Sequence, residues 1–167
     1  MMTVSFIADV MLGHLSRWLR LLGFDTLYRN DFIDREILRI GRQQGRIILT
    51  RDSGILRSRI CTLCVAITKD SVRDQLLEVA RYLGCSGFCE MPQEPRCPIC
   101  NGLVGTIPRK ALLQELPEHV RLENTAFFRC SECGKVYWNG SHATGISAMR
   151  SAFHGEISAQ CVIQKRS

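Results

Sequence analysis

The clearest strand signal in the chain is the stretch Arg46-Ile47-Ile48-Leu49-Thr50-Arg51-Asp52. Its central residues are aliphatic or β-branched, which favours a buried strand, and an arginine and an aspartate end the apolar run. Shorter runs of the same kind occupy residues 4–8 and 63–67, and residues 25–28 are a fourth candidate. We expect these four runs to be strands of one sheet.

Helical periodicity separates the predicted strands. Apolar residues recur at helical spacing over residues 12–22, and Gly23 follows them as a helix C-cap. A second amphipathic stretch begins at Asp31 or Asp34, and a third opens on the capping-box pattern Ser71-Val72-Arg73-Asp74. Strands that alternate with helices at this spacing predict an α/β fold, with a parallel sheet covered by helices on both faces.

The alternating pattern stops near Gly84, where the composition changes. Residues 86–96 contain a glycine and two prolines and are typical of a linker. We therefore divide the chain into an α/β domain over residues 1–90, a cysteine-bearing unit over residues 91–143 and a tail over residues 144–167. The tail shows little periodicity, so we expect it to be loosely structured.

Composition and charge restrict the class of protein. The 167 residues are 46% hydrophobic and 23% charged, as in an ordinary globular protein, and the formal net charge is +6. No apolar run approaches the roughly 18 residues that cross a bilayer, and Asp9 interrupts the N-terminal apolar stretch, so neither a membrane span nor a signal peptide is indicated. We expect a cytoplasmic protein whose basic charge favours a polyanionic partner such as nucleic acid.

Two of the predicted strands end in an aspartate. Asp9 follows the first strand, and Asp52 follows the strand at residues 47–50. Ligands of parallel α/β sheets bind beyond the carboxyl ends of the strands, so we expect both carboxylates at one edge, with Asp31 or Asp34 nearby. Such carboxylates repel one another unless a cation neutralises them, and oxygen ligands suit Mg²⁺ or Mn²⁺. The alternative is that Asp9 and Asp52 only cap helices, as aspartate often does.

Four of the nine cysteines have the spacing of a zinc site. They form two C-x-x-C knuckles with a glycine close behind each: Cys97-Pro98-Ile99-Cys100-Asn101-Gly102 and Cys130-Ser131-Glu132-Cys133-Gly134-Lys135. Two such knuckles bring four thiolates together around a tetrahedral Zn²⁺, and a redox dithiol is the main alternative. We expect a helical segment over residues 110–116 in the spacer. The predicted zinc ligands are Cys97, Cys100, Cys130 and Cys133.

The remaining cysteines carry weaker signals. Cys61 and Cys64 also read C-x-x-C, but they lead into a predicted buried strand without a glycine turn, so we interpret them as core residues. No role follows from the sequence for Cys85, Cys89 and Cys161.

Basic and aromatic residues accompany both candidate sites. Arg17 and Arg20 lie on the helix that follows Asp9, and arginine beside a metal site is suited to bidentate contact with phosphate. Aromatic side chains flank the second knuckle, where they suit stacking on unpaired bases or building the core of a small ribbon. These are Phe127, Phe128, Tyr137 and Trp138.

Several motifs recur in order over about residues 4–142. They are both knuckles, with Val136-Tyr137-Trp138 and Gly140-Ser141-His142 after the second, and the stretches Phe6-Ile7-Ala8-Asp9-Val10-Met11-Leu12-Gly13, Leu15-Ser16-Arg17-Trp18-Leu19-Arg20-Leu21-Leu22-Gly23-Phe24-Asp25 and Ile48-Leu49-Thr50-Arg51-Asp52. Together they resemble the motifs of the Mut7-C ribonuclease family. The resemblance implies a PIN-like nuclease fold joined to a zinc ribbon, and a divalent-metal ribonuclease whose acids correspond to Asp9, Asp52 and one of Asp31 or Asp34.

The chain departs from the family pattern at two places. His14 stands where a lysine is often found, which removes one candidate phosphate contact. Ser53 and Gly54 follow Asp52 where PIN domains often carry a further acid, which favours one tightly held ion over two.

Two functions remain open. In the first, an endoribonuclease, Asp9 and Asp52 hold Mg²⁺ or Mn²⁺ and Asp34 orients the attacking water. Arg17 and Arg20 hold phosphate there, and the zinc ribbon helps to bind RNA. The second function is a non-catalytic RNA- or ribosome-associated adaptor with an incomplete metal site. The two differ in whether a third acid lies close to Asp9 and Asp52, as charge-coupled carboxylates must.

Overall fold

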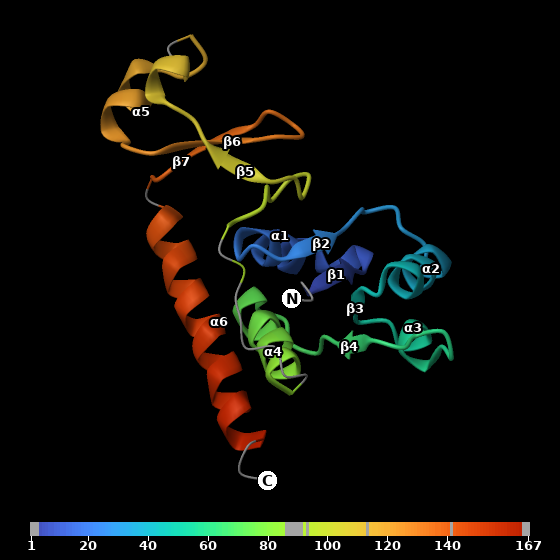
Figure 1. Cartoon of the computed structure of the whole chain (residues 1–167). Coiled ribbons are helices and arrows are strands. Elements are labelled where there is room, and N and C mark those ends of the chain that lie inside the picture. Colours follow the sequence, from blue (N-terminus) through green and yellow to red (C-terminus); the bar gives the residue numbers. More distant parts are fainter. Residues whose placement is uncertain (1–3, 86–91, 93, 113, 141, 165–167) are drawn as a thin grey trace.

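A computed structural model describes residues 4–85, 92, 94–112, 114–140 and 142–164 (Figure 1). Its larger sheet has four parallel strands in the order β2-β1-β3-β4, as predicted. The strands are β1 (Ser5–Ala8), β2 (Asp25–Leu27), β3 (Ile47–Thr50) and β4 (Cys64–Ala66).

Helices cover both faces of this sheet, because side chains alternate along each strand. Phe6 and Leu49 pack toward α1 and α4, whereas Ile7 and Ile48 pack toward α2 and α3. The α/β class predicted from the sequence is therefore confirmed. The covering helices are α1 (Gly13–Leu21), α2 (Asp34–Gln44), α3 (Ser53–Arg57) and α4 (Val72–Cys85), with a short 3₁₀ turn, η1 (Val10–Leu12), before α1.

The C-terminal residues form a long helix, α6 (His142–Gln164), which corrects the prediction of a loosely structured tail. In Figure 1 α6 runs along α4, and Phe153 and Ile157 are fully buried in the main core. The Phe153 ring lies 5.6 Å from the ring of Phe24. This helix was not predicted from the sequence because its apolar stripe is narrow and many of its other residues are alanine, serine or glycine.

The cysteine-bearing unit is a three-stranded antiparallel sheet in the order β5-β6-β7. Its strands are β5 (Val104–Thr106), β6 (Phe127–Cys130) and β7 (Val136–Trp138). The spacer holds η2 (Arg109–Leu112) and α5 (Glu118–Glu123), so the helical segment expected over residues 110–116 is replaced by two shorter ones. Pro117 is the N-cap of α5, and its fixed φ suits the start of a helix. The domain boundaries themselves stay a prediction.

The first knuckle docks directly onto β2, the edge strand of the large sheet. Asn101 takes a left-handed φ of 72°, and its side-chain oxygen accepts a hydrogen bond of 3.0 Å from the Thr26 amide. Its side-chain nitrogen donates to Asp25 at 2.6 Å. An asparagine thus takes the place of a further strand at this sheet edge, since it offers one donor and one acceptor.

Arg20 joins the same two units from the interior. It is only 4% exposed, and its Nε donates to the Thr26 carbonyl at 2.9 Å. Its Nη1 donates to the carbonyls of Pro98 and Ile99, at 3.0 Å each. Burial lowers the pKa of Arg20, an effect that the nearby cysteines oppose. The guanidinium therefore ties α1, β2 and the first knuckle together.

Asp25 completes this junction. Burial alone would raise the pKa of its carboxyl, but hydrogen bonds from Arg46 and Asn101 outweigh burial and lower the pKa. Arg46 lies 2.9 Å from the Asp25 carboxylate in an ion pair that is mostly buried. The charged form of Asp25 is thus the one that the fold stabilises.

We predict that Arg20→Met lowers the free energy of unfolding by about 2–3 kcal/mol, because three carbonyls lose a charged donor. Arg17→Met is the matched control: Arg17 is exposed on the same helix, and we expect a change within about 0.5 kcal/mol. Urea unfolding at neutral pH measures both. Equal effects of the two substitutions would contradict the structural role of Arg20.

Candidate functional site

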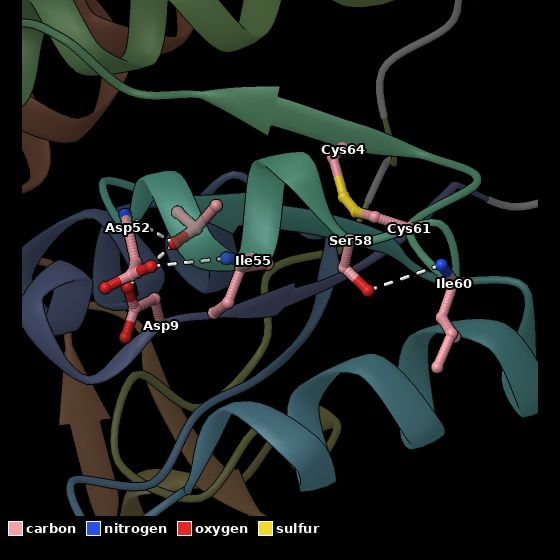
Figure 2. Close-up of a disulfide and its surroundings, with 8 residues drawn as sticks. Asp9, Asp52, Ile55, Ser58, Ile60, Cys61 and Cys64 are labelled. Carbon is pink, nitrogen blue, oxygen red and sulfur yellow. Dashed lines mark hydrogen bonds between the residues drawn. A yellow bond between two sulfur atoms is a disulfide. The ribbon is translucent and has the colours of Figure 1, made fainter.

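Asp9 and Asp52 meet at the carboxyl edge of the sheet, as the strand ends predicted. β1 and β3 are neighbours, and the Asp9 amide continues their pairing with a 2.9 Å hydrogen bond to the Leu49 carbonyl. The Thr50 hydroxyl donates to Asp9 Oδ2 at 2.8 Å and accepts from the Asp52 amide at 2.9 Å. Figure 2 draws Asp9 next to Asp52 at this edge.

The two aspartates differ in what else they do. Asp52 is exposed and is the N-cap of α3, where its Oδ1 accepts hydrogen bonds from the amides of Gly54 and Ile55. Asp9 is 4% exposed and stands before η1, but its side chain makes no capping bond. Asp52 therefore caps a helix through Oδ1, whereas the side chain of Asp9 does not cap one. A buried carboxylate with one hydroxyl partner is a candidate for a cation ligand.

The turn after Asp9 depends on the close approach of Gly13 to Tyr28. The Tyr28 hydroxyl donates to the Val10 carbonyl at 3.0 Å. A Cβ at position 13 would lie 2.7 Å from that hydroxyl oxygen. Glycine at this position lets Tyr28 hold the backbone that carries Asp9.

Asp31 and Asp34 are both exposed, and they are engaged differently. Both carboxylate oxygens of Asp31 accept from the Arg29 guanidinium, at 2.9 and 2.7 Å. This partner lowers the pKa of Asp31. Asp34 lies in the first turn of α2, where a negative charge is favourable. Within the described residues, Asp9, Asp52 and either of these acids do not form a cluster of three carboxylates close enough to hold a metal ion.

Arg17 and Arg20 differ in their exposure and in their contacts. Arg17 is exposed, and no hydrogen bond or ion pair holds it within the described part of the chain, so it is free to contact a ligand. Arg20 is buried against backbone carbonyls, which corrects the prediction that it binds phosphate.

Two further acids lie beyond β4, and the sequence analysis did not single them out. Asp70 is exposed and pairs with Arg51 at 2.7 Å. Glu78 accepts hydrogen bonds from the amides of Thr68 and Lys69 and so fixes the loop after β4. The rule that acids follow strand ends would have found Asp70. Glu78 lies within α4 and carries no such signal.

The four predicted zinc ligands come together. Their sulfur atoms all lie within 4.8 Å of one another, with 3.7 Å between Cys97 and Cys133 and 3.4 Å between Cys100 and Cys130. Zn–S bonds of about 2.3 Å in a tetrahedron place the sulfurs about 3.8 Å apart. The donor set and its spacing therefore fit Zn²⁺.

The surroundings of the cluster favour a thiolate at Cys97. Burial would raise the pKa of its thiol, but hydrogen bonds from Tyr137 and from the amides of Cys100 and Ile99 outweigh burial and lower the pKa to about 6. Desolvation and the neighbouring thiols raise the pKa of Cys100 to about 12. A bound metal ion would allow four thiolates to coexist here, because its charge would offset theirs.

Close packing also explains the glycine of the first knuckle. A Cβ at position 102 would lie 2.9 Å from the sulfur of Cys130 and 2.5 Å from the Glu132 side chain. Glycine at position 102 thus allows the second knuckle to reach the cluster.

Cys61 and Cys64 form a disulfide, which differs from the prediction that they only pack in the core (Figure 2). They do pack against the cluster of Ile7, Ile37 and Ile48, so the core assignment holds in part. Their bond closes the turn between α3 and β4. Cys89 lies outside the described residues, as do the side chains of Cys85 and Cys161.

Fold and site together define an α/β protein with an acidic sheet edge and an appended cluster of four cysteines that could hold a metal ion. The chain belongs to the Mut7-C RNAse domain family, which matches residues 4–150. This confirms the resemblance drawn from the motifs. Comparison with curated proteins and with solved structures found no match. None of the helices in the described part of the chain has the length and hydrophobicity that crossing a membrane requires.

We predict that Gly13→Ala lowers the free energy of unfolding by about 1–3 kcal/mol through overpacking against Tyr28. Adding Tyr28→Phe removes the closest atom and should recover part of the loss. Urea unfolding of the single and double variants measures the coupling. A stabilised Gly13→Ala, as helix propensity alone would give, contradicts the contact.

We predict about one zinc ion per purified chain, falling to near zero in Cys100→Ser. Cys61→Ser is the matched control, because it removes a cysteine of the other C-x-x-C pair, and it should keep its zinc. Elemental analysis by mass spectrometry measures both. A zinc-free wild type whose four thiols oxidise in pairs would establish the redox alternative.

Proposed function

We propose that this protein is a cytoplasmic, metal-dependent endoribonuclease that cuts RNA at the sheet edge carrying Asp9 and Asp52. The observation that carries the proposal is the Thr50 hydroxyl, which holds the buried Asp9 carboxylate against the backbone of Asp52. Membership in an RNase domain family supports RNA as the substrate.

The donor set at this edge suits Mg²⁺ or Mn²⁺. Mg²⁺ is often bound by one or two carboxylates, and waters and substrate phosphates complete its shell. Asp9 Oδ1 and Asp52 Oδ2 take no part in the hydrogen bonds that hold these side chains, so each residue can offer an oxygen. When bound, the ion would neutralise both carboxylates and stabilise the charge that develops at a phosphodiester.

Two exposed side chains complete the proposed site. Asp34 is our candidate for orienting the attacking water, because the competing acid Asp31 already has both oxygens engaged by Arg29. Arg17 is our candidate for phosphate contact, because nothing in the described part of the chain occupies its guanidinium. The zinc ribbon would help to bind the RNA.

A second candidate function is a non-catalytic RNA- or ribosome-associated adaptor. It is favoured by one observation: within the described residues no third carboxylate gathers with Asp9 and Asp52. A metal site without its third acid would bind RNA and leave it intact.

We predict that Asp9→Asn lowers the rate of RNA cleavage by about 100-fold or more, as expected for loss of a positioned catalytic carboxylate. The assay uses end-labelled single-stranded and structured RNA with Mg²⁺ or Mn²⁺. Asp31→Asn is the matched control, because it removes an acid near the site that is already paired. Asp34→Asn tests the third acid, and we expect a loss of the same order.

The adaptor would replace the nuclease if the wild type cut none of these substrates while the folded, zinc-loaded chain bound RNA. Equal cleavage by wild type and Asp9→Asn would remove the sheet edge as the site of chemistry. Both of these conclusions require that the zinc content and the unfolding midpoint of each variant match those of the wild type.

A further inference from the structure

A large apolar cavity lies where the zinc ribbon faces α1 and α6. Its volume is about 640 Å³, within the range of sites that bind small ligands. Phe128, Tyr137 and Trp138 line it from the ribbon, and Leu21 and Ile146 line it from the helices. The cavity is separate from the acidic edge: Leu21 ends α1, whereas Asp9 lies before its start, and a nine-residue helix is roughly 13 Å long.

The charges around this cavity all have one sign. Arg96, Lys135 and Arg150 line it, and no aspartate or glutamate is among its described lining residues. Arg96 donates to the Asn101 carbonyl, and Arg150 donates to the carbonyls of Leu22 and Pro92, so both guanidiniums are fixed in place. Lys135 is exposed, and no partner holds its ammonium group within the described part of the chain. An anionic ligand would therefore meet only cationic groups among the charged side chains that line the cavity.

The indole of Trp138 offers a flat surface to such a ligand. Trp138 is 42% exposed although it is the largest side chain of the ribbon. Gly140 approaches the indole so closely that a Cβ there would lie 3.2 Å from its Cδ1 and Nε1 atoms. A side chain at position 140 would thus crowd the ring, and glycine leaves that part of the ring uncovered. Aromatic rings next to free cations are the combination that binds unpaired nucleotides.

We propose that this cavity binds one unpaired nucleotide of a single-stranded RNA, with the base against Trp138 and the phosphate at Lys135. The proposal rests on the proposed function for the identity of the polymer as RNA. It adds a site remote from the acidic edge that selects unpaired strands. The site requires no cleavage, so it can be tested apart from the chemistry.

The test measures binding of a fluorescein-labelled six-nucleotide single-stranded RNA to the full, zinc-loaded chain by fluorescence anisotropy. All proteins carry Asp9→Asn so that the RNA stays intact. We expect Lys135→Glu and Trp138→Ala each to raise Kd about 10-fold or more, because a stacked base contributes about 1–3 kcal/mol. Trp138→Phe keeps an aromatic ring and should stay within about 3-fold. Lys110→Glu is the matched control for charge, because Lys110 is exposed on the ribbon and does not line the cavity.

Three outcomes would overturn the proposal: unchanged Kd in both Lys135→Glu and Trp138→Ala, equal loss in Lys110→Glu, or equal affinity for a double-stranded RNA of the same length. The last would indicate phosphate contact alone. If a protein with wild-type Asp9 cleaves RNA but the cavity variants bind RNA as tightly as their parent, the nucleotide site is contradicted and the nuclease proposal is supported. If RNA binding depends on Trp138 and Lys135 but the wild-type chain never cuts RNA, the nucleotide site is supported and the nuclease proposal is contradicted.

Discussion

The arrangement of the whole molecule depends on one buried charge, the guanidinium of Arg20. A charged group in a protein interior is costly unless its donors find acceptors, and Arg20 finds them in three carbonyls from β2 and the first knuckle. Asn101 and Asp25 close the same junction with side-chain hydrogen bonds to the edge strand. The zinc knuckle is therefore fixed to the sheet by polar contacts with defined directions, and the cavity between ribbon and helices takes its shape from that attachment.

The parallel sheet was predictable because β1, β3 and β4 lie in short apolar runs, the pattern of buried parallel strands, whereas β2, with the sequence Asp25-Thr26-Leu27, carries a weaker signal. Residues 46–52 alone indicate a buried strand that ends in an acid. The long helix at residues 142–164 was not predictable in the same way, because few of its residues are large and apolar. Phe153 and Ile157 are buried by partners far away in the chain, such as Phe24, and periodicity within a segment does not reveal such partners.

The candidate sites show the same difference between signals within a short segment, which the sequence reveals, and contacts between distant segments, which it does not. Cysteine spacing identified the metal cluster, because a C-x-x-C turn brings its two sulfurs together locally and only the pairing of the two turns depends on the fold. Strand ends identified Asp9 and Asp52, because neighbouring parallel strands end at one edge. Arg20 was assigned to phosphate because an arginine on a helix next to an acid looks the same whether its side chain points outward or inward. Its acceptors at residues 98 and 99 lie far along the chain.

The docking of Asn101 on β2 also bears on how such a chain can change over evolutionary time. Many zinc ribbons are joined to their neighbours by a flexible linker, and a linker of that kind can be cut and rejoined elsewhere. Here the ribbon supplies two acceptors for a buried cation and covers a sheet edge, so its removal would expose the Thr26 amide and leave Arg20 Nη1 without its two carbonyl acceptors. Loss of the ribbon would therefore leave polar groups of the α/β domain without partners. An insertion would be expected to cost least at α5, in the spacer between the knuckles, because none of the residues of this helix is buried.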